Sequence, residues 1–168
     1  CPRVAAARDL AAGGGLGRLY HLEADYLWGR PWKLTAGWRG RMPYYSVILG
    51  AAVHMVDLAV WIMGETPVAV QTHGHALATA GSGFPFDDFA LILLHFANGL
   101  VAKVSAHGGG IHPHFHRLAL FGSAGTFVHE SEGAALYTAG PEGPQRADAP
   151  GEYPAAAAKS RLIHSFVD

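Results

Sequence analysis

The stretch FALILLHFANGLVAKVSA, residues 89–106, decides the fold class of this chain. Two apolar runs flank the dipeptide Asn98-Gly99, which is the strongest short-range signal for a β-hairpin. Further segments have the length and composition of strands, at residues 18–28, 68–75, 115–121, 126–129 and 134–138. Strands that follow one another through turns indicate an α+β protein and not the alternating pattern of a parallel sheet. We therefore predict a mostly antiparallel open β-sheet with helices packed on one face.

One long apolar segment interrupts this series of strands. Residues 47–63, VILGAAVHMVDLAVWIM, are long enough to favour a helix, and Gly64 supplies a stop. A helix that is apolar all round is buried on most sides. One stripe of this segment differs from the rest and contains its two polar residues. It consists of Gly50, His54, Asp57 and Trp61, whose spacing of i, i+4, i+7 and i+11 places them on one face of a helix.

The remaining segments are two helix-prone stretches near the ends of the chain and two loops. Residues 4–12 are helix-prone and stop at three glycines, residues 29–46 form a loop rich in Trp and Arg, and residues 139–158 form a Pro- and Gly-rich surface loop. Residues 159–168 have the pattern of a further helix. The chain does not begin with Met and opens on what resembles the back half of a helix, so we expect a fragment of a longer protein.

Composition restricts the class of protein. The 168 residues are 50% hydrophobic and 15% charged, which indicates one globular domain with a buried core. This apolar share suggests surfaces that another domain or subunit covers. The net charge is −1 and the 12 Lys and Arg form no run, which argues against nucleic acid or a membrane surface as partner. A single cysteine, Cys1, excludes an intrachain disulfide and fits a cytoplasmic location.

Several short motifs occur in an order that points to one family. They are residues 15–19 (GLGRL), 37–39 (GWR), 50–58 (GAAVHMVDL), 96–99 (FANG) and 122–126 (GSAGT). The ordered set resembles the C-terminal domain of the Gfo/Idh/MocA oxidoreductases. The resemblance implies a domain with the fold of the dihydrodipicolinate reductase C-terminal domain over residues 1–168.

The resemblance also implies a function and partners. Members of this family look like two-domain enzymes in which an N-terminal Rossmann domain binds NAD or NADP. The C-terminal domain closes the site for a sugar, inositol or related polyol and forms homo-oligomer contacts through its open sheet. The implied fragment lacks the cofactor-binding domain with its catalytic lysine, so by itself it is expected to be inactive. The glycine-rich residues 13–17 (GGGLG) are consistent with the absence of a cofactor-binding loop. They follow a predicted helix and precede a predicted strand, whereas a dinucleotide-binding loop follows a strand and precedes a helix.

His54 is the predicted catalytic residue. The resemblance places it beside the substrate, and a histidine suits the removal of a hydroxyl proton because its pKa lies near neutral pH. The alternative is a buried histidine with a structural partner. The family often has Asp four residues before this histidine, but here that position is Gly50. Asp57 lies on the other side of His54 and cannot simply take over; it is a predicted substrate contact, with a structural role as the alternative.

Trp28, Trp38 and Arg39 are the other predicted substrate contacts. Aromatic faces pack against sugar C–H groups, and Arg binds hydroxyls or a carboxylate. The alternative is that their loop packs on the helix or on another domain.

A second group of polar residues is His112, His114 and His116, which alternation would place on one strand face. Histidine is the commonest metal ligand, but no Cys or carboxylate accompanies these three, so we predict no metal site. They could instead line the substrate cleft or lie on the surface.

Three hypotheses on function follow. The first is the substrate-binding and oligomerisation domain of an NAD(P)-dependent dehydrogenase. The second is a non-catalytic relative that binds a ligand or a protein, which the missing acid at position 50 supports. The third is a domain that serves assembly alone.

Overall fold

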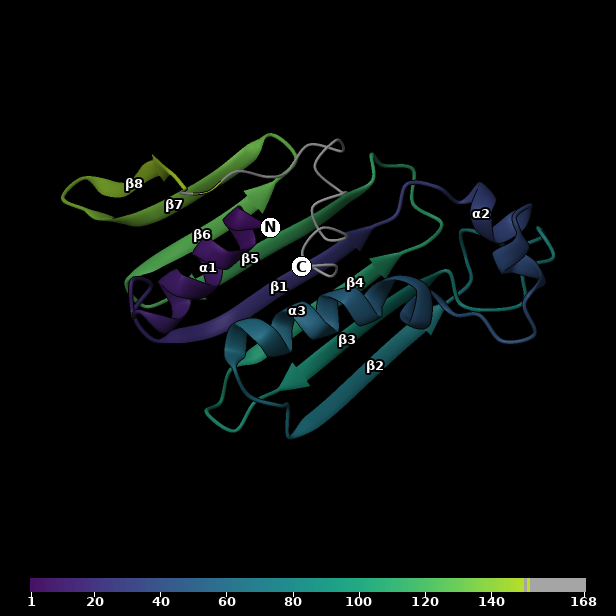
Figure 1. Ribbon diagram of the computed structural model, residues 1–168, viewed down its shortest axis with the longest axis horizontal. Coiled ribbons are helices and arrows are strands. Elements are labelled where there is room, and N and C mark those ends of the chain that lie inside the picture. The colour runs from purple at the N-terminus through teal and green to yellow at the C-terminus, as the bar shows by residue number, and fades with distance from the viewer. Residues whose placement is uncertain (150, 152–168) are drawn as a thin grey trace, which may run out of the picture.

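The computed structural model describes residues 1–149 and 151, and its strands form one sheet in the order β2-β3-β4-β1-β5-β6-β7-β8 (Figure 1). The strands are β1 (Leu19–Leu27), β2 (Ala69–His75), β3 (Phe89–His95), β4 (Val101–His107), β5 (Phe115–Gly122), β6 (Gly125–Glu130), β7 (Gly133–Gly140) and β8 (Gly143–Asp148). Neighbouring strands are antiparallel except β1 and β4, which are parallel. The predicted, mostly antiparallel open sheet is confirmed.

The predicted hairpin is the β3–β4 pair. The Asn98 side chain accepts a hydrogen bond from the Leu100 N–H at 2.9 Å, and the Phe96 N–H donates to the Leu100 carbonyl at 3.0 Å. These bonds close the turn and set the register in which Ile92 faces Val104. The hairpin therefore places both buried side chains on the same face of the sheet.

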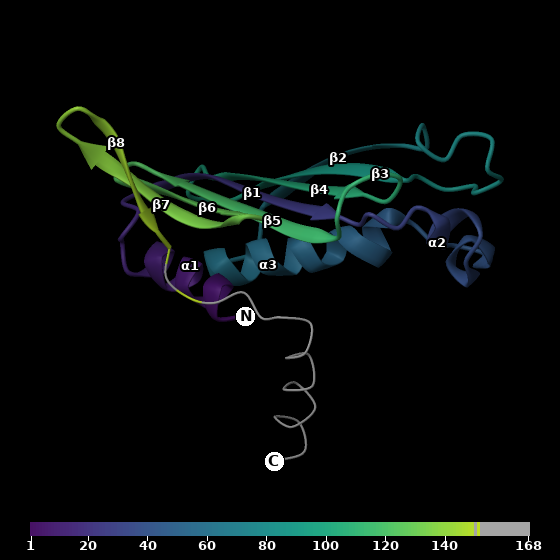
Figure 2. The same cartoon turned by 90° about the horizontal axis from the view of Figure 1, so that it is seen from above.

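Helices cover only that face (Figure 2). They are α1 (Pro2–Ala12) and α3 (Val53–Met63), while α2 (Trp32–Thr35) and the 3-10 helix η1 (Trp38–Arg41) lie at one end of the sheet. The core between helices and sheet includes fully buried side chains such as Leu22, Leu118, Leu120 and Phe127. Burial of each such side chain contributes about 1.5–3 kcal/mol, which holds the helices on the sheet.

The predicted helix over residues 47–63 differs in two respects. It begins with a π-helical turn, η2 (Ile48–Ala52), and becomes α-helical only from Val53. The prediction that it is buried on most sides is wrong, since Leu49 is 64% exposed and Trp61 is 40% exposed. The physical reason is that the helix lies on a single-layered sheet, so that one side faces the sheet and its outer side is covered only in part, as where Arg8 of α1 lies over the Trp61 ring.

The predicted surface loop over residues 139–158 is also wrong in part. β7 continues to Gly140 and pairs with β8, an edge strand whose side chains are all exposed. Backbone pairing with β7 forms this strand without an apolar pattern, and Pro144 is tolerated at a sheet edge. Residues 150 and 152–158, and the predicted helix over residues 159–168, lie outside the described residues.

The face without helices carries a network of ion pairs at its centre. Asp25 on β1 is 6% exposed, and its carboxylate receives Lys103 Nζ at 2.9 Å, Arg117 Nη1 at 3.1 Å and the Ser105 hydroxyl at 2.5 Å. Arg117 also pairs with Glu23. Burial acts to raise the pKa of Asp25, but these hydrogen bonds and charges outweigh it and hold the pKa below its usual value. Asp25 is therefore ionised at neutral pH.

The network also determines which nitrogen of His107 carries a proton. His107 Nε2 lies 2.9 Å from the Ser105 hydroxyl, whose one proton is donated to Asp25. The imidazole must then donate from Nε2 to the hydroxyl oxygen. A chain of hydrogen bonds thus runs across this open face from His107 to Asp25.

No helix among the described residues is long and apolar enough to cross a membrane.

Candidate active site

Two strands and one helix bring a group of aromatic rings together at the end of β1. Tyr26 lies directly opposite His116 of β5 in the strand register, and their ring centroids are 4.5 Å apart. The His54 ring, from the first turn of α3, stacks on Tyr26 at 5.8 Å. His114 lies 5.3 Å from Tyr26 and 5.1 Å from His116. Three imidazoles therefore surround one phenol where β1, β5 and α3 meet.

A glycine makes this close packing possible. Gly29 follows β1 with a φ of +65°, and a Cβ at this position would lie 1.8 Å from the His112 carbonyl oxygen. The segment before β5 therefore runs directly against the end of β1. His114 Nδ1 lies 3.2 Å from the Trp28 carbonyl oxygen, which anchors the imidazole beside Tyr26.

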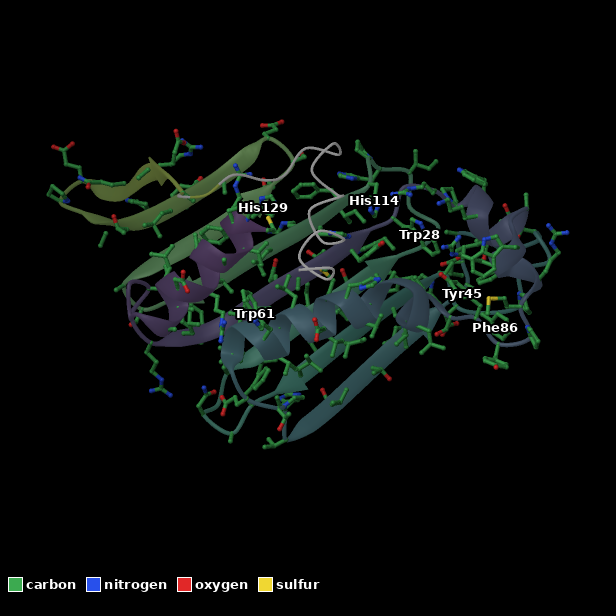
Figure 3. All side chains as sticks on the ribbon, in the orientation of Figure 1. Trp28, Tyr45, Trp61, Phe86, His114 and His129 are labelled. Carbon is green, nitrogen blue, oxygen red and sulfur yellow. The ribbon has the colours of Figure 1, made fainter. Side chains whose placement is uncertain are left out.

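The loop between β1 and α3 adds aromatic and cationic groups. The Arg39 guanidinium lies 4.4 Å from the centre of the Trp38 ring and 5.9 Å from that of Trp28, both within the range of cation–π contacts. The Trp28 and Tyr45 rings are 6.3 Å apart, and Figure 3 shows both at the end of the sheet that carries α2. Arg39 is thus held between two tryptophans.

Burial and positive charge shift the pKa values of this group. Burial, with help from His114 and His54, lowers the pKa of His116 to about 4. Its Nε2 is buried and forms no hydrogen bond with any described residue. Burial raises the pKa of Tyr26, while Arg30 and Arg39 oppose the rise. At neutral pH the site therefore contains a neutral His116 and a protonated Tyr26 beside fixed positive charges.

Comparison with known proteins identifies the fold and its family. The model of the GFO/IDH/MocA C-terminal domain matches residues 4–128, most of the chain. The chain belongs to the Gfo/Idh/MocA family. No curated protein matches its sequence.

Solved structures of similar fold agree with the Gfo/Idh/MocA assignment. Levoglucosan dehydrogenase, in complex with NADH and levoglucosan, aligns with a TM-score of 0.71 at 20% identity over 97% of this chain and 52% of that one. An inositol dehydrogenase homologue from Azotobacter vinelandii, complexed with NAD+, gives 0.72 at 17% identity over 92% and 43%. The myo-inositol 2-dehydrogenase of Lactobacillus plantarum gives 0.69 at 15% over 99% and 48%. The chain spans about half the length of these proteins.

The departure from the Gfo/Idh/MocA motif at position 50 has a structural cause. A Cβ at Gly50 would lie 1.7 Å from the Tyr45 hydroxyl oxygen and 2.3 Å from the ring carbon that bears it. Tyr45 is 8% exposed, and its hydroxyl makes no hydrogen bond of ordinary geometry with the described residues. The phenol thus fills the space in which the side chain of an aspartate would begin.

The structure brings most of the predicted site residues to one end of the domain. His54, Trp28, Trp38 and Arg39 all lie there. Asp57 is exposed on α3, three residues beyond His54, and forms no hydrogen bond or ion pair with the described residues. Its predicted substrate contact therefore remains a prediction.

Sequence reasoning missed Tyr26 and Tyr45. Tyr26 has the strand periodicity of a core residue, and only the register shows that it faces His116. The three predicted histidines do not share a strand face, because β5 begins at Phe115 and only His116 belongs to it. His112 is exposed and contacts the Pro113 carbonyl instead.

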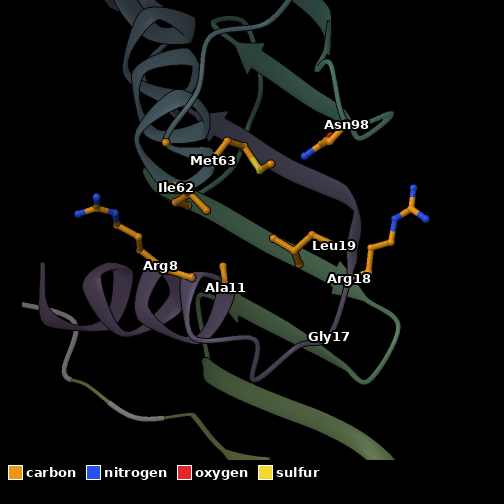
Figure 4. Close-up of a pocket in the computed structure, with 10 residues that line it drawn as sticks. Arg8, Ala11, Gly17, Arg18, Leu19, Ile62, Met63 and Asn98 are labelled. Atoms are coloured by element: carbon orange, nitrogen blue, oxygen red, sulfur yellow. The ribbon is translucent and has the colours of Figure 1, made fainter.

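The site contains no metal cluster among the described residues, and a cavity lies elsewhere in the domain. Within residues 1–149 and 151, no three His, Cys, Asp or Glu side chains are arranged to hold a metal ion. A cavity of about 310 Å³ lies at the opposite end of α3, where Arg8 and Ala11 of α1 face Ile62, Met63 and Asn98 (Figure 4). We base the site on the His54 group, because the cavity contains arginines but no group that could act as a base near neutral pH.

The described residues do not form a dinucleotide-binding unit of the Rossmann type. The run of glycines at residues 13–17 connects α1 to β1, so no helix N-terminus follows it to receive a pyrophosphate. We therefore derive no cofactor contact from this chain.

Proposed function

We propose that this chain is the substrate-binding and oligomerisation domain of an NAD(P)-dependent dehydrogenase that acts on a sugar, an inositol or a related polyol. Family membership supports an oxidoreductase, and the solved structures of similar fold include an inositol dehydrogenase homologue with NADH and myo-inositol. The cofactor would be bound mainly by a Rossmann domain outside this chain.

The observation that carries the proposal is the position of His54. Its side chain is exposed at the edge of the Tyr26–His116 group, where it stacks on the Tyr26 ring. A base must reach the proton that it removes, so an exposed imidazole in the first turn of α3 meets a requirement that a buried one would not. Trp28, Trp38 and Arg39 are close by and can bind the hydroxyl groups and C–H faces of the substrate.

In the proposed reaction, a secondary alcohol loses a hydride to the oxidised nicotinamide and its hydroxyl proton to a base, leaving a ketone. His54 accepts that proton on a ring nitrogen and becomes an imidazolium, which later releases the proton to water. Tyr26, stacked on His54, keeps the ring oriented toward the substrate. The roles of Trp38 and Arg39 are to orient the substrate, with Asp57 as a further contact.

The open face of the sheet is the proposed homo-oligomer surface. Its strands β3, β4 and β1 carry half-buried apolar side chains such as Leu91, Leu93 and Val101 around the Asp25 network. An antiparallel sheet can leave one face to water, but an apolar face with a satisfied ion network at its centre favours pairing with a second copy.

A non-catalytic relative is the second possibility. Its support is Gly50, since the acid that would accompany His54 is replaced and its space is filled by Tyr45. In that case the aromatic and cationic loop would bind a ligand without turnover.

The test is a hydride-transfer assay on the full-length protein, with NAD+ and NADP+ against sugars, sugar acids and inositols. Reduced cofactor should appear with at least one substrate, and His54→Ala should lower kcat by about 10²–10⁴-fold. Gln145→Ala is the control, because Gln145 is an exposed residue on the edge strand β8, far from the site in the strand order. Cofactor binding without turnover of any substrate would favour the non-catalytic relative.

A further inference from the structure

We propose that the site prefers a negatively charged sugar derivative over its neutral counterpart, with Arg39 as the residue that binds the anionic group. This inference rests on the proposed function and specifies its substrate class. It follows from the charges at the His54 end of the domain, from the way Arg39 is held, and from the residue that fills the place of the missing acid.

The loop that carries Arg39 and the segment that leads into β5 contain basic residues and no acidic ones. Between Asp25 and Asp57 the sequence has no Asp or Glu, and neither does the stretch that carries His112, His114 and His116 up to His129. Asp25 faces the opposite side of the sheet, where Lys103 and Arg117 neutralise it. Asp57 lies almost one helical turn beyond His54 on α3, farther along the chain from the Arg39 loop, and Asp88, in the loop between β2 and β3, accepts the Thr79 N–H at 2.5 Å. Arg30, Lys33 and Arg39 are therefore left without a carboxylate partner among the described residues.

The pKa values respond to this crowding of positive charge. Arg30 and Arg39 add to the effect of desolvation and lower the pKa of Lys33. The same two arginines oppose the burial that raises the pKa of Tyr26, and Arg30 is among the groups that lower the pKa of His116. Like charges placed this close repel one another, so binding of an anion between them would relieve that repulsion.

Arg39 is held ready for an anion. Its guanidinium lies between the Trp38 and Trp28 rings, which restrict its motion and leave its N–H groups without a carboxylate acceptor among the described residues. A guanidinium fixed in this way binds a carboxylate or phosphate through two parallel hydrogen bonds, at a smaller entropic cost than a mobile side chain. Neutral sugar hydroxyls do not offer this bidentate acceptor.

Tyr45 occupies the space that an acidic side chain at position 50 would need. An aspartate at position 50 would lie one helical turn before His54 and would repel an anion. Here the Tyr45 phenol fills that position, is buried, and makes no hydrogen bond of ordinary geometry with the described residues. Burial raises the pKa of Tyr45 and the nearby Arg39 opposes this, so the hydroxyl stays neutral and adds no negative charge.

The experiment is calorimetric titration of the full-length protein, with NAD(H) present, using pairs of ligands that differ in charge. Suitable pairs are galactose with galacturonate, glucose with glucuronate, and glucose with glucose 6-phosphate. We expect the charged member of at least one pair to bind about tenfold more tightly or better, and salt to weaken its binding. The carboxylate and phosphate pairs distinguish which anion the site takes.

Variants decide whether Arg39 is responsible. Arg39→Met should abolish the preference for the charged ligand, and Arg39→Lys should retain it only in part, because Lys lacks the fork of donors. Arg41→Met is the matched control, since it removes the same charge from the same short helix, η1, at an exposed position. It should keep the preference.

Equal or tighter binding of the neutral sugars in every pair would overturn the inference. So would an Arg39→Met variant that keeps the preference, or one that weakens only NAD(H) binding, which would assign the cations to the cofactor phosphates. Selective binding of the anion without hydride transfer would refute the proposed dehydrogenase and leave the inference in place.

Discussion

The Tyr45 phenol and the Gly50 backbone occupy adjoining space that only one side chain can fill. A Cβ at position 50 would clash with the Tyr45 hydroxyl, and Gly50 lies within the π-helical turn Ile48–Ala52 that opens the helix. Such π-helical turns inside helices are often associated with functional sites. A side chain larger than that of glycine at position 50 is therefore incompatible with the present position of Tyr45, five residues earlier.

Gly50→Ala should destabilise the protein by about 1–3 kcal/mol, because the added methyl group overpacks against the Tyr45 ring. Combined with Tyr45→Ala, it should cost much less than it does alone, which a double-mutant cycle measured by urea denaturation would show. Gly110→Ala is the control, since a Cβ there would make only an ordinary contact at 3.4 Å. Additive effects of the two substitutions would contradict the packing described here.

Asp25→Ala should be among the most damaging polar substitutions. It removes one of the two carboxylates that Lys103 and Arg117 share and leaves only Glu23 beside both cations. Loss of one partner of a buried ion pair costs about 3–5 kcal/mol, and the remaining Glu23 places this variant at the lower end of that range. Asp148→Ala removes an exposed carboxylate paired with Arg146 and should change stability by less than about 0.5 kcal/mol. Comparable denaturation midpoints for the two variants would show that the Asp25 network contributes little.

His116 should make the protein less stable as the pH falls below 6.5. Its pKa is about 4 in the folded state and 6.5 when unfolded, so between these values the unfolded chain binds more protons. The contribution from His116 is complete above pH 6.5 and is lost toward pH 4. Allowing for its partial exposure, we expect a loss of about 1 kcal/mol between pH 7 and pH 5.

The measurement is the thermal midpoint of wild type and His116→Gln at pH 7, 6 and 5. The variant should lose less stability than wild type, although His129, whose pKa burial also lowers to about 4, still contributes in the same direction. His73→Gln, at an exposed position, should follow the wild-type curve. Parallel curves for His116→Gln and wild type would show that His116 is not buried in its neutral form.

The open sheet face should carry the subunit interface. Sedimentation at micromolar concentration should show a dimer or larger oligomer for wild type, and Leu91→Asp should shift it toward monomer by placing a charge in an apolar contact. Val70→Asp introduces the same charge on the exposed edge strand β2, on the opposite face, and should leave the assembly intact. A monomeric wild type would remove the interface from this face.

Local sequence was sufficient to predict the strands and the hairpin. Asn98-Gly99 joins two apolar runs, and the structure confirms both strands and shows the hydrogen bond that closes their turn. The family motifs were sufficient to select His54 and Arg39, because each lies inside a short pattern. The edge strand β8 could not be predicted, since backbone pairing with β7 and not apolar periodicity forms it.

By itself, the sequence determined the fold class, the family and the helix that carries His54, because these depend on patterns within a few residues. Only the tertiary structure decided which residues share the site. The register that sets Tyr26 against His116 joins positions 90 residues apart, and the contact of Tyr45 with Gly50 depends on how the loop folds back onto the helix. Contacts of this kind depend on the packing of several elements at once, and no local pattern in the chain encodes them.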